Sequence, residues 1–245
     1  MKKTPVFSVI IPAHNEEKFL GNCLKTILNQ DFPRTEYEVI VVNNHSTDQT
    51  KKIAQQFKVK LVNEARKGVV YARQTGFLQA KGRIIVQTDA DCLVPSNWLS
   101  SIYRSFKQNP QAVAVAGPST VRGKDIYSRL GPKILTEINA LHYRLFANPL
   151  GVLAGNLAVK KEVLKRMSGY NTALPHFADQ LELCSRLKKQ GRIYFNKDLL
   201  IQESNRRWQK RLIPFLLKDV FYYNFLNYFF YKISRKNLGT WEDYR

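Results

Sequence analysis

The sequence predicts an α/β fold with a largely parallel sheet and helices on both of its faces. Short, almost continuous apolar runs, typical of buried parallel strands, recur along the first half of the chain. Each run is followed by a segment with helical periodicity, and strands that alternate with helices in this way form right-handed βαβ units. The length of 245 residues suffices for one such domain.

The elements follow one another in a regular order. In the first half we predict strands over 6–11, 37–42, 59–62 and 84–87, and helices over 16–29, 47–57 and 67–80. In the second half we predict a helix over 96–108, a strand over 112–116, and helices over 126–146 and 180–190, with a small-residue segment at 153–156. No internal repeat or Gly/Ser-rich linker divides the chain, so one catalytic domain with a tail is expected.

Composition restricts the partners and the compartment. The formal net charge of +20 attracts anions, which include nucleic acid, an anionic membrane face and phosphorylated small molecules. Cys23, Cys92 and Cys184 are odd in number and widely spaced, so they indicate neither a disulfide framework nor a zinc site, and a reducing cytoplasm fits best. The apolar run at 6–11 is too short for a signal-peptide core, and no cleaved targeting segment is expected.

Three predicted loops that follow strands carry acids, amides or small residues. They lie at 13–17, 43–48 and 88–91. Ligands of open α/β sheets bind at the carboxyl ends of the strands, so all three loops should open onto one binding edge.

The loop at 88–91 contains two carboxylates in the run Asp89-Ala90-Asp91. A spacing of two places both carboxylates on one side of an extended chain. This arrangement suits a divalent cation that keeps open positions for diphosphate oxygens. An Asx turn before the next helix is the alternative, and the local sequence does not separate the two.

Other acids occur where helices are predicted to begin. Asp48 lies in the first turn after Ser46, which has capping-box spacing to Gln49. Glu16 and Asp179 also lie at predicted helix starts, where acids are ordinary. Spacing alone does not separate a helix cap from a catalytic base.

Near residue 206 two arginines, Arg206 and Arg207, adjoin Trp208. Such a group can grip phosphates or stack on a ring, and solvated surface arginines are the alternative.

Taken in order, these loops resemble the family 2 glycosyltransferases, which have the Rossmann-like GT-A fold. The resemblance spans roughly residues 5–208. It rests on the runs at 9–17, 41–48, 67–68, 72–74, 80–82 and 88–91, and then on Gly155-Asn156, Gly169-Tyr170, Asp179, Leu183, Arg186-Leu187 and Gly191.

The resemblance implies roles for individual residues. Asp179 would be the catalytic base, and Asp91 would ligate Mn²⁺ or Mg²⁺. The nucleotide sugar would be bound by Pro12, Ala13, Glu16, Asn43, Asn44, Arg73, Asp89, Ala90, Arg206 and Arg207. Gly155, Asn156 and Trp208 would lie in the acceptor or donor-sugar region.

The implied reaction is an inverting transfer from a UDP- or GDP-sugar to a glycan or lipid-linked acceptor. Residues 1–209 would form the GT-A domain, with a nucleotide-binding half at 1–94 and an acceptor-binding half at 95–209. Two departures matter. Many relatives carry an acid where Asn43 or Asn44 stands, which makes uracil a less secure prediction. Ser204 replaces the glutamine of the Gln-x-x-Arg-Trp motif in processive relatives, so single addition is expected.

The segment 210–245 is predicted to be a helical tail. Its aromatic stretch at 212–233 is interrupted by Pro214, Lys218 and Asp219, which makes it a poor transmembrane span. A helix in an anionic membrane interface is one interpretation, and a helix packed on the domain or a dimer contact is the other. The first would make the protein cytoplasmic and peripheral at the inner face of the plasma membrane, while the oligomeric state stays open.

Three other functions fit the sequence less well. A sugar nucleotidyltransferase usually has a Gly-rich loop near the first strand, and residues 12–17 contain no glycine. A basic nucleic-acid-binding module is supported mainly by the charge, and no helix-turn-helix, zinc or RNP pattern accompanies it, so no nucleic-acid partner is expected. The intact acids at 89, 91 and 179 argue against an inactive homologue that serves as a membrane scaffold.

Overall fold

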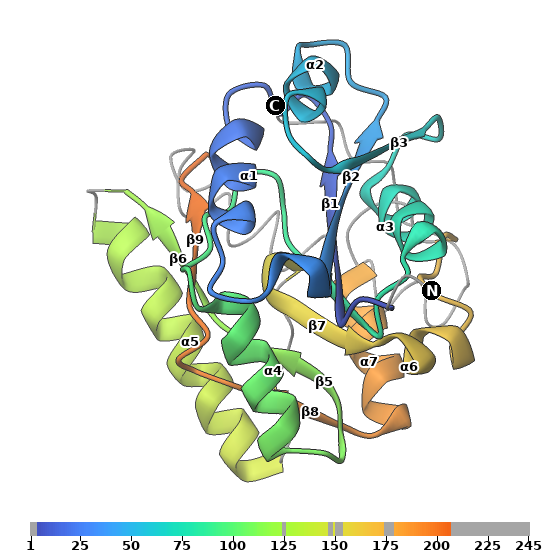
Figure 1. Cartoon of the computed structure of the whole chain (residues 1–245). Coiled ribbons are helices and arrows are strands. Elements are labelled where there is room, and N and C mark those ends of the chain that lie inside the picture. The colour runs from blue at the N-terminus through green and yellow to red at the C-terminus, as the bar shows by residue number, and fades with distance from the viewer. Residues whose placement is uncertain (1–3, 124–125, 147–148, 150–153, 174–178, 207–245) are drawn as a thin grey trace.

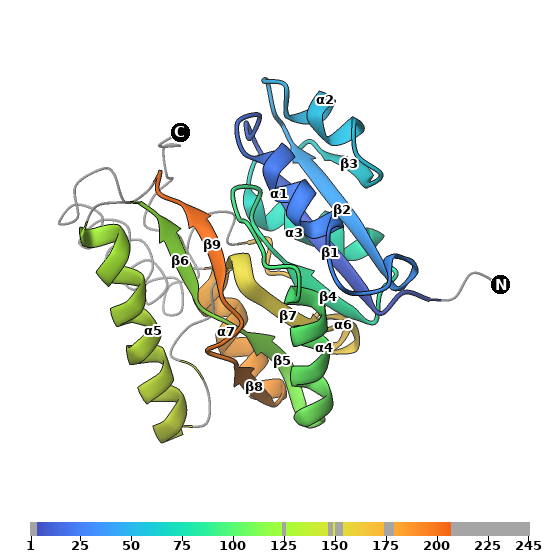
Figure 2. The same cartoon turned by 60° about the vertical axis from the view of Figure 1, so that its left-hand side comes forward.

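A seven-stranded sheet forms the centre of the molecule (Figures 1 and 2). The structure, a computed structural model, describes residues 4–123, 126–146, 149, 154–173 and 179–206. The sheet has the order β3-β2-β1-β4-β7-β5-β8. Its strands are β1 (Phe7–Ala13), β2 (Tyr37–Asn44), β3 (Lys60–Glu64), β4 (Ile84–Gln87), β5 (Ala112–Ala116), β7 (Leu157–Lys160) and β8 (Arg192–Phe195).

Most neighbouring strands run parallel, which confirms the predicted sheet type. The strands β3, β2, β1 and β4 are mutually parallel, and β5 is parallel to β8. Strand β7 is antiparallel to both β4 and β5, so it alone reverses the direction inside the sheet.

Helices cover both faces of the sheet, as the alternation of side chains requires. They are α1 (Leu20–Leu28), α2 (Thr50–Gln55), α3 (Val69–Gln79), α4 (Trp98–Gln108), α5 (Ile126–Phe146), α6 (Lys161–Arg166) and α7 (Asp179–Gln190), with short 3₁₀ turns η1 (Arg34–Glu36) and η2 (Ala154–Asn156). Val9 of β1 points to the face covered by α1, α2 and α4. Its neighbour Ile10 points to the face covered by α3, α6 and α7, because successive side chains of a strand point to opposite sides.

A second, two-stranded sheet stands beside the first. It pairs β6 (Ser119–Arg122) with β9 (Ile201–Ser204) in parallel. Leu93, in the loop after β4, exchanges two backbone hydrogen bonds with Gln202 of β9, at 2.7 and 2.9 Å. The late strand β9 is thereby fixed beside the acidic loop that follows β4.

The structure differs from the sequence prediction at the ends of several elements. Strand β1 continues through Pro12 to Ala13, paired with β2, because its ladder with β4 already ends at Ile10 and the missing N–H of Pro12 breaks no bond on that side. The predicted helix start at Glu16 was wrong, because a turn that closes on the Glu16 carbonyl precedes α1.

Several short elements were not predicted at all. They are β6, β7, β8, β9 and α6, each of four to six residues. The strands among them form by pairing with segments far away in the sequence, so their local pattern is weak.

The predicted tail at 210–245 lies outside the described residues, as do Arg207 and Trp208. Among the helices that the structure does describe, none combines the length and the apolarity needed to cross a bilayer.

Glu64, at the end of β3, joins the strand to the loop and helix that follow. Its carboxylate accepts hydrogen bonds from the Arg66 guanidinium at 2.8 and 3.0 Å and from the Thr75 hydroxyl of α3 at 2.5 Å. These bonds, above all those from Arg66, lower the pKa of Glu64 from 4.5 to about 2. The ionised carboxylate therefore stabilises the folded state.

We expect Glu64→Gln to lower the free energy of unfolding by about 1–2 kcal/mol at pH 7, because bonds to a nearly buried charged acceptor are lost. A carboxyl group whose pKa is lower in the folded state contributes its full stabilisation at pH values above its pKa in the unfolded chain. The difference from the wild type should therefore shrink as the pH falls from 4.5 toward 2. Urea denaturation across this pH range measures it. The exposed Glu162→Gln is the control, and an equal loss at all pH values would contradict the assignment.

Candidate active site

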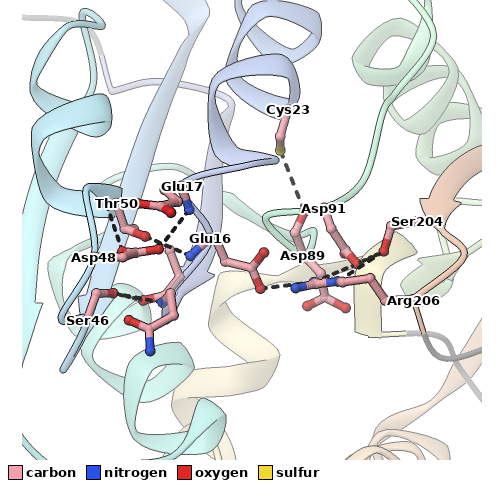
Figure 3. A network of polar contacts seen from close by, with 12 residues as sticks. Glu16, Glu17, Cys23, Ser46, Asp48, Thr50, Asp89, Asp91, Ser204 and Arg206 are labelled. Carbon is pink, nitrogen blue, oxygen red and sulfur yellow. Dashed lines mark hydrogen bonds and ion pairs between the residues drawn. The ribbon is translucent and has the colours of Figure 1, made fainter. Parts of the chain in front are cut away.

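Two loops at the carboxyl edge of the sheet are locked together by reciprocal hydrogen bonds (Figure 3). The Glu17 N–H donates to Asp48 Oδ2 at 3.0 Å, and the Gln49 N–H donates back to Glu17 Oε2 at 3.0 Å. Asn15 Oδ1 accepts a bond from the Thr47 N–H at 2.9 Å. These side chains satisfy backbone donors across the loops and so hold the ends of β1 and β2 together.

The predicted capping box between Ser46 and Gln49 was wrong. Ser46 Oγ accepts a bond from the Asn15 N–H at 3.1 Å and donates to the Ala13 carbonyl, so it belongs to the contact between the loops. Asp48 does act at the start of α2, where its Oδ1 accepts the Thr50 N–H at 2.9 Å. Asp48 itself precedes α2, so the predicted place in the first helical turn was wrong, although its carboxylate does bind the N–H of the first helical residue.

The two asparagines at the end of β2 have different surroundings. The Asn44 amide donates to the carbonyls of Glu64 and Arg66 and accepts the Gly68 N–H, so it shapes the loop that leads into α3. Asn43 is 8% exposed. Its Nδ2 donates to Asn63, while its Oδ1 has no hydrogen-bond partner within the described chain. Asn43 therefore offers a buried acceptor at the binding edge.

Asp91 lies in a dense polar group at the end of β4 (Figure 3). Its Oδ2 accepts hydrogen bonds from Arg206 Nη2 at 2.9 Å and from the Ser204 hydroxyl. The same Arg206 nitrogen donates to Glu16 Oε1 at 3.1 Å, and the Arg122 guanidinium donates to the Asp91 carbonyl at 3.0 Å. Arg206 thus balances two carboxylates that come from the loops after β1 and β4.

Arg73 connects the two halves of the domain from the middle of α3. Its side chain is 4% exposed, and it forms ion pairs with Asp89 at 3.2 Å and with Asp179 at 2.5 Å. Burial lowers the pKa of Arg73, but Asp179 and Asp89 more than offset this effect and the pKa is raised overall. The guanidinium therefore stays charged between the acidic loop after β4 and the start of α7.

Burial raises the pKa of the Asp179 carboxyl, and the charge of Arg73 opposes that rise. Gln180 also donates a hydrogen bond to Asp179 Oδ2 at 2.7 Å. A carboxylate that holds a proton more tightly than an exposed aspartate is chemically suited to accept one from a substrate.

The start of α7 is positioned by contacts with α3 and with the turn after α6. Gln74, next to Arg73, accepts a hydrogen bond from the Tyr170 N–H at 2.8 Å. Arg186 of α7 donates to the carbonyls of Met167 and Gly169. Adjacent residues of α3 therefore hold both the turn and the aspartate.

The small-residue segment lies behind the acidic loop. A Cβ on Gly155 would lie 3.1 Å from Cys92 Sγ and 3.5 Å from Asp89 Oδ2, so the residue permits a close approach. Asn156 is fully buried, accepts the Trp98 indole N–H at 2.9 Å and donates to the carbonyls of Pro118 and Leu199. The side chain of Asn156 thus joins α4 to the segments that lead into β6 and β9.

The structure brings together most of the residues singled out from the sequence. Pro12, Ala13, Glu16, Asn43, Asn44, Asp89, Ala90 and Asp91 lie at the ends of β1, β2 and β4, and Arg73, Asp179 and Arg206 reach them from α3, α7 and the end of β9. Sequence reasoning missed Arg122, Gln180 and the contact role of Ser204. Arg122 and Ser204 are at the ends of strands that had no local signal.

A divalent cation at this edge would have few ligands from the chain. Among the described residues, no three His, Cys, Asp or Glu side chains are grouped as a metal site. Asp89 and Asp91 supply hard carboxylate oxygens two residues apart. Mg²⁺ and Mn²⁺ accept one or two carboxylates when phosphates and water complete their shell, so the residues fit a cation that binds together with a phosphorylated ligand.

The sheet and the acidic loop after β4 define a GT-A fold. The solved mannosyltransferase PcManGT from Pyrobaculum calidifontis, in complex with GDP-Man and Mn²⁺, superposes with a TM-score of 0.67 and 27% identity over 82% of this chain and 57% of its own. The sequence model described as Glycosyl transferase family 2 matches residues 8–167. The chain belongs to glycosyl transferase family 2.

Two curated relatives extend the comparison. Glycosyltransferase AglE of Haloferax volcanii is 40% identical over 101 residues, which are 39% of this chain and 33% of AglE. The poly(ribitol-phosphate) β-N-acetylglucosaminyltransferase TarS of Staphylococcus aureus is 28% identical over 145 residues, which are 57% of this chain and 25% of TarS. The TarS 1–349 structure with UDP-GlcNAc shares the fold at a TM-score of 0.65 and 20% identity, over 81% of this chain and 58% of its own. The chain thus spans a quarter to a third of these curated relatives.

Removal of the buried guanidinium should cost much stability. We expect Arg73→Met to lower the free energy of unfolding by about 3 kcal/mol or more, because Asp89 and Asp179 lose their shared counter-charge inside the protein. Urea denaturation at neutral pH measures the loss. Arg104→Met, at an exposed arginine of α4, is the matched control and should stay within about 0.5 kcal/mol of the wild type. Equal unfolding midpoints for the two variants would contradict the role of Arg73.

Proposed function

We propose that this chain is the catalytic domain of an inverting, metal-dependent glycosyltransferase. It transfers one sugar from a UDP- or GDP-sugar to a glycan or lipid-linked acceptor. The observation that carries the proposal is the meeting of Asp89, Asp91 and Asp179 with two arginines at the carboxyl edge of the sheet, in a member of family 2. In this proposal, residues 1–94 bind the nucleotide and residues 95–209 bind the acceptor.

The donor side is supported by the buried acceptor of Asn43 and by the relatives. Uracil and guanine both present a ring N–H that an amide oxygen can accept, so Asn43 suits either base. PcManGT was solved with GDP-Man and Mn²⁺. Both observations favour a nucleoside diphosphate sugar as the ligand of this edge.

The leaving diphosphate gains negative charge as its bond to the sugar breaks. A divalent cation, when bound, supplies positive charge at that point. Asp91 is the residue that would hold it. Arg206, which pairs with Asp91 and Glu16, would share in stabilising the charge by binding a phosphate oxygen.

The acceptor side needs a base. In the proposed step the acceptor hydroxyl gives its proton to Asp179, its oxygen attacks the anomeric carbon, and the electron pair of the sugar–phosphate bond leaves with the diphosphate. Attack from the opposite side inverts the anomeric centre. Arg73 fixes Asp179 relative to Asp89, and so keeps the base at a constant distance from the donor loop.

The acceptor is proposed by class only. TarS is named as a transferase that acts on poly(ribitol-phosphate). That name supports an acceptor of the cell-envelope polymer type, and the strongly basic chain suits acceptors that carry phosphate.

Donor binding should stabilise the fold only in the presence of the metal. We expect UDP- or GDP-sugars with Mn²⁺ to raise the melting temperature, because a ligand at 100 times its Kd adds about 2.7 kcal/mol to the free energy of unfolding. A thermal-shift panel of nucleotide sugars with and without Mn²⁺ measures this. If no donor raised the melting temperature while DNA or RNA bound tightly at physiological salt, the protein would instead be a nucleic-acid-binding module.

Two variants should separate donor binding from chemistry. Asp91→Asn should lose the Mn²⁺-dependent thermal shift, because it removes a carboxylate ligand. Asp179→Asn should keep the shift but lose transfer by about 10²-fold or more, because it removes the base. The exposed Asp198→Asn is the control and should behave as the wild type. Wild-type transfer rates in both site variants would refute the proposed mechanism.

A further inference from the structure

Helix α5 carries a continuous row of exposed apolar side chains. Of the seven large hydrophobic residues exposed in the described chain, five lie on this helix and are 47–68% exposed. Successive members are three or four residues apart, a spacing that places them on one face of a helix. We call this row the α5 stripe; it consists of Leu130, Ile134, Ile138, Leu141 and Leu145.

The opposite face of α5 is anchored to the protein. Tyr143 packs against the rings of Tyr194 and Phe195, with centroids 6.2 and 6.3 Å away, and Ala140 joins the core beneath α7 and β8. The helix lies at the outer edge of the molecule beside β6 in both views (Figures 1 and 2). The stripe therefore faces outward from a helix that is held by its other side.

The charges around the stripe are mainly positive. Lys133 and Arg144 are exposed on α5, against one exposed acid in its described side chains, Glu137. The whole chain carries +20. An apolar helical face flanked by lysine and arginine is the composition that binds the interface of anionic bilayers.

The size of the stripe argues against a dimer contact. Five half-exposed leucine and isoleucine side chains present on the order of 500 Å², whereas a standard protein interface buries roughly 800 Å² on each partner. A narrow row of this kind can instead enter the boundary between head groups and acyl chains along its whole length.

We propose that the α5 stripe docks the protein on the surface of an anionic membrane, with the stripe at the level of the acyl chains and Lys133 and Arg144 at the phosphates. The docking face is close to the candidate active site, because α5 contacts β6 and Arg122 of β6 bonds to the Asp91 carbonyl. Membrane docking does not require sugar transfer, so the docking proposal can be tested independently of the proposed function.

Vesicle binding tests the surface in the full chain. We expect the wild type to sediment with vesicles of phosphatidylcholine mixed with phosphatidylglycerol, and less with phosphatidylcholine alone or at high salt. Ile138→Glu should lower the partition coefficient about tenfold or more, because it sets a charge into the apolar row. Leu78→Glu, at an isolated exposed leucine of α3, is the control and should bind like the wild type.

A spin label reports the contact directly and does not depend on loss of binding. Because all three native cysteines are buried, a label can be directed to Leu141→Cys or, as the control, to Leu78→Cys. On addition of anionic vesicles we expect the label at 141 to gain contact with oxygen, which concentrates in the acyl region, while the label at 78 does not.

Several outcomes would overturn the proposal. Wild-type binding by Ile138→Glu would place membrane contact elsewhere in the chain. A label at 141 that is already immobile without vesicles would show that another segment or a second copy covers the stripe. Light scattering at increasing protein concentration would then distinguish these two occupants.

Discussion

The buried ion-pair triad of Asp89, Arg73 and Asp179 is the contact on which the arrangement of the site depends. Burial of a guanidinium that is 4% exposed costs much free energy unless carboxylates pair with its charge. The two that do so come from the loop after β4 and from the start of α7. A helix in the first half of the chain therefore fixes an acid from each half, and the core sets the distance between the acidic loop and the proposed base.

A second arginine, Arg206, likewise pairs with two carboxylates, at a position nearer to solvent. Glu16 and Asp91 come from the loops after β1 and β4 and would repel one another at the same edge, and one arginine nitrogen pairs with both. This arrangement also explains why the second sheet matters. The strand β9 carries Ser204 and leads to Arg206, and its backbone bonds to Leu93 hold it against the acidic loop. The carboxylates are thus held in position and balanced before any ligand arrives.

The two surfaces proposed to bind ligands differ in their chemistry. The edge formed by β1, β2 and β4 gathers polar groups whose partners are fixed by hydrogen bonds from within the protein, and this rigidity suits the recognition of a small phosphorylated ligand. The face of α5 has apolar side chains with no comparable fixed partners in the described chain. Such a face suits a lipid surface, which has no fixed structure of its own. Strand β6 connects the two surfaces, since it packs on α5 and bonds through Arg122 to Asp91.

The parallel βαβ order and the three polar loops follow from the sequence alone. Apolar runs, helical periodicity and the position of loops after strands are local signals, and the physics of a parallel sheet brings such loops to one edge. The sequence also pointed to Arg206, because a second arginine and an aromatic residue adjoin it. Asp179 was assigned the role of base only by resemblance, because a helix cap and a base look alike in sequence. Tertiary structure alone decided that Asn156 supports the core, that Ser46 joins two loops, and that β6 and β9 exist and bring Arg122 and Ser204 to Asp91. These contacts join residues roughly 30 to 115 positions apart, and a distance that is set by packing leaves no trace in local sequence.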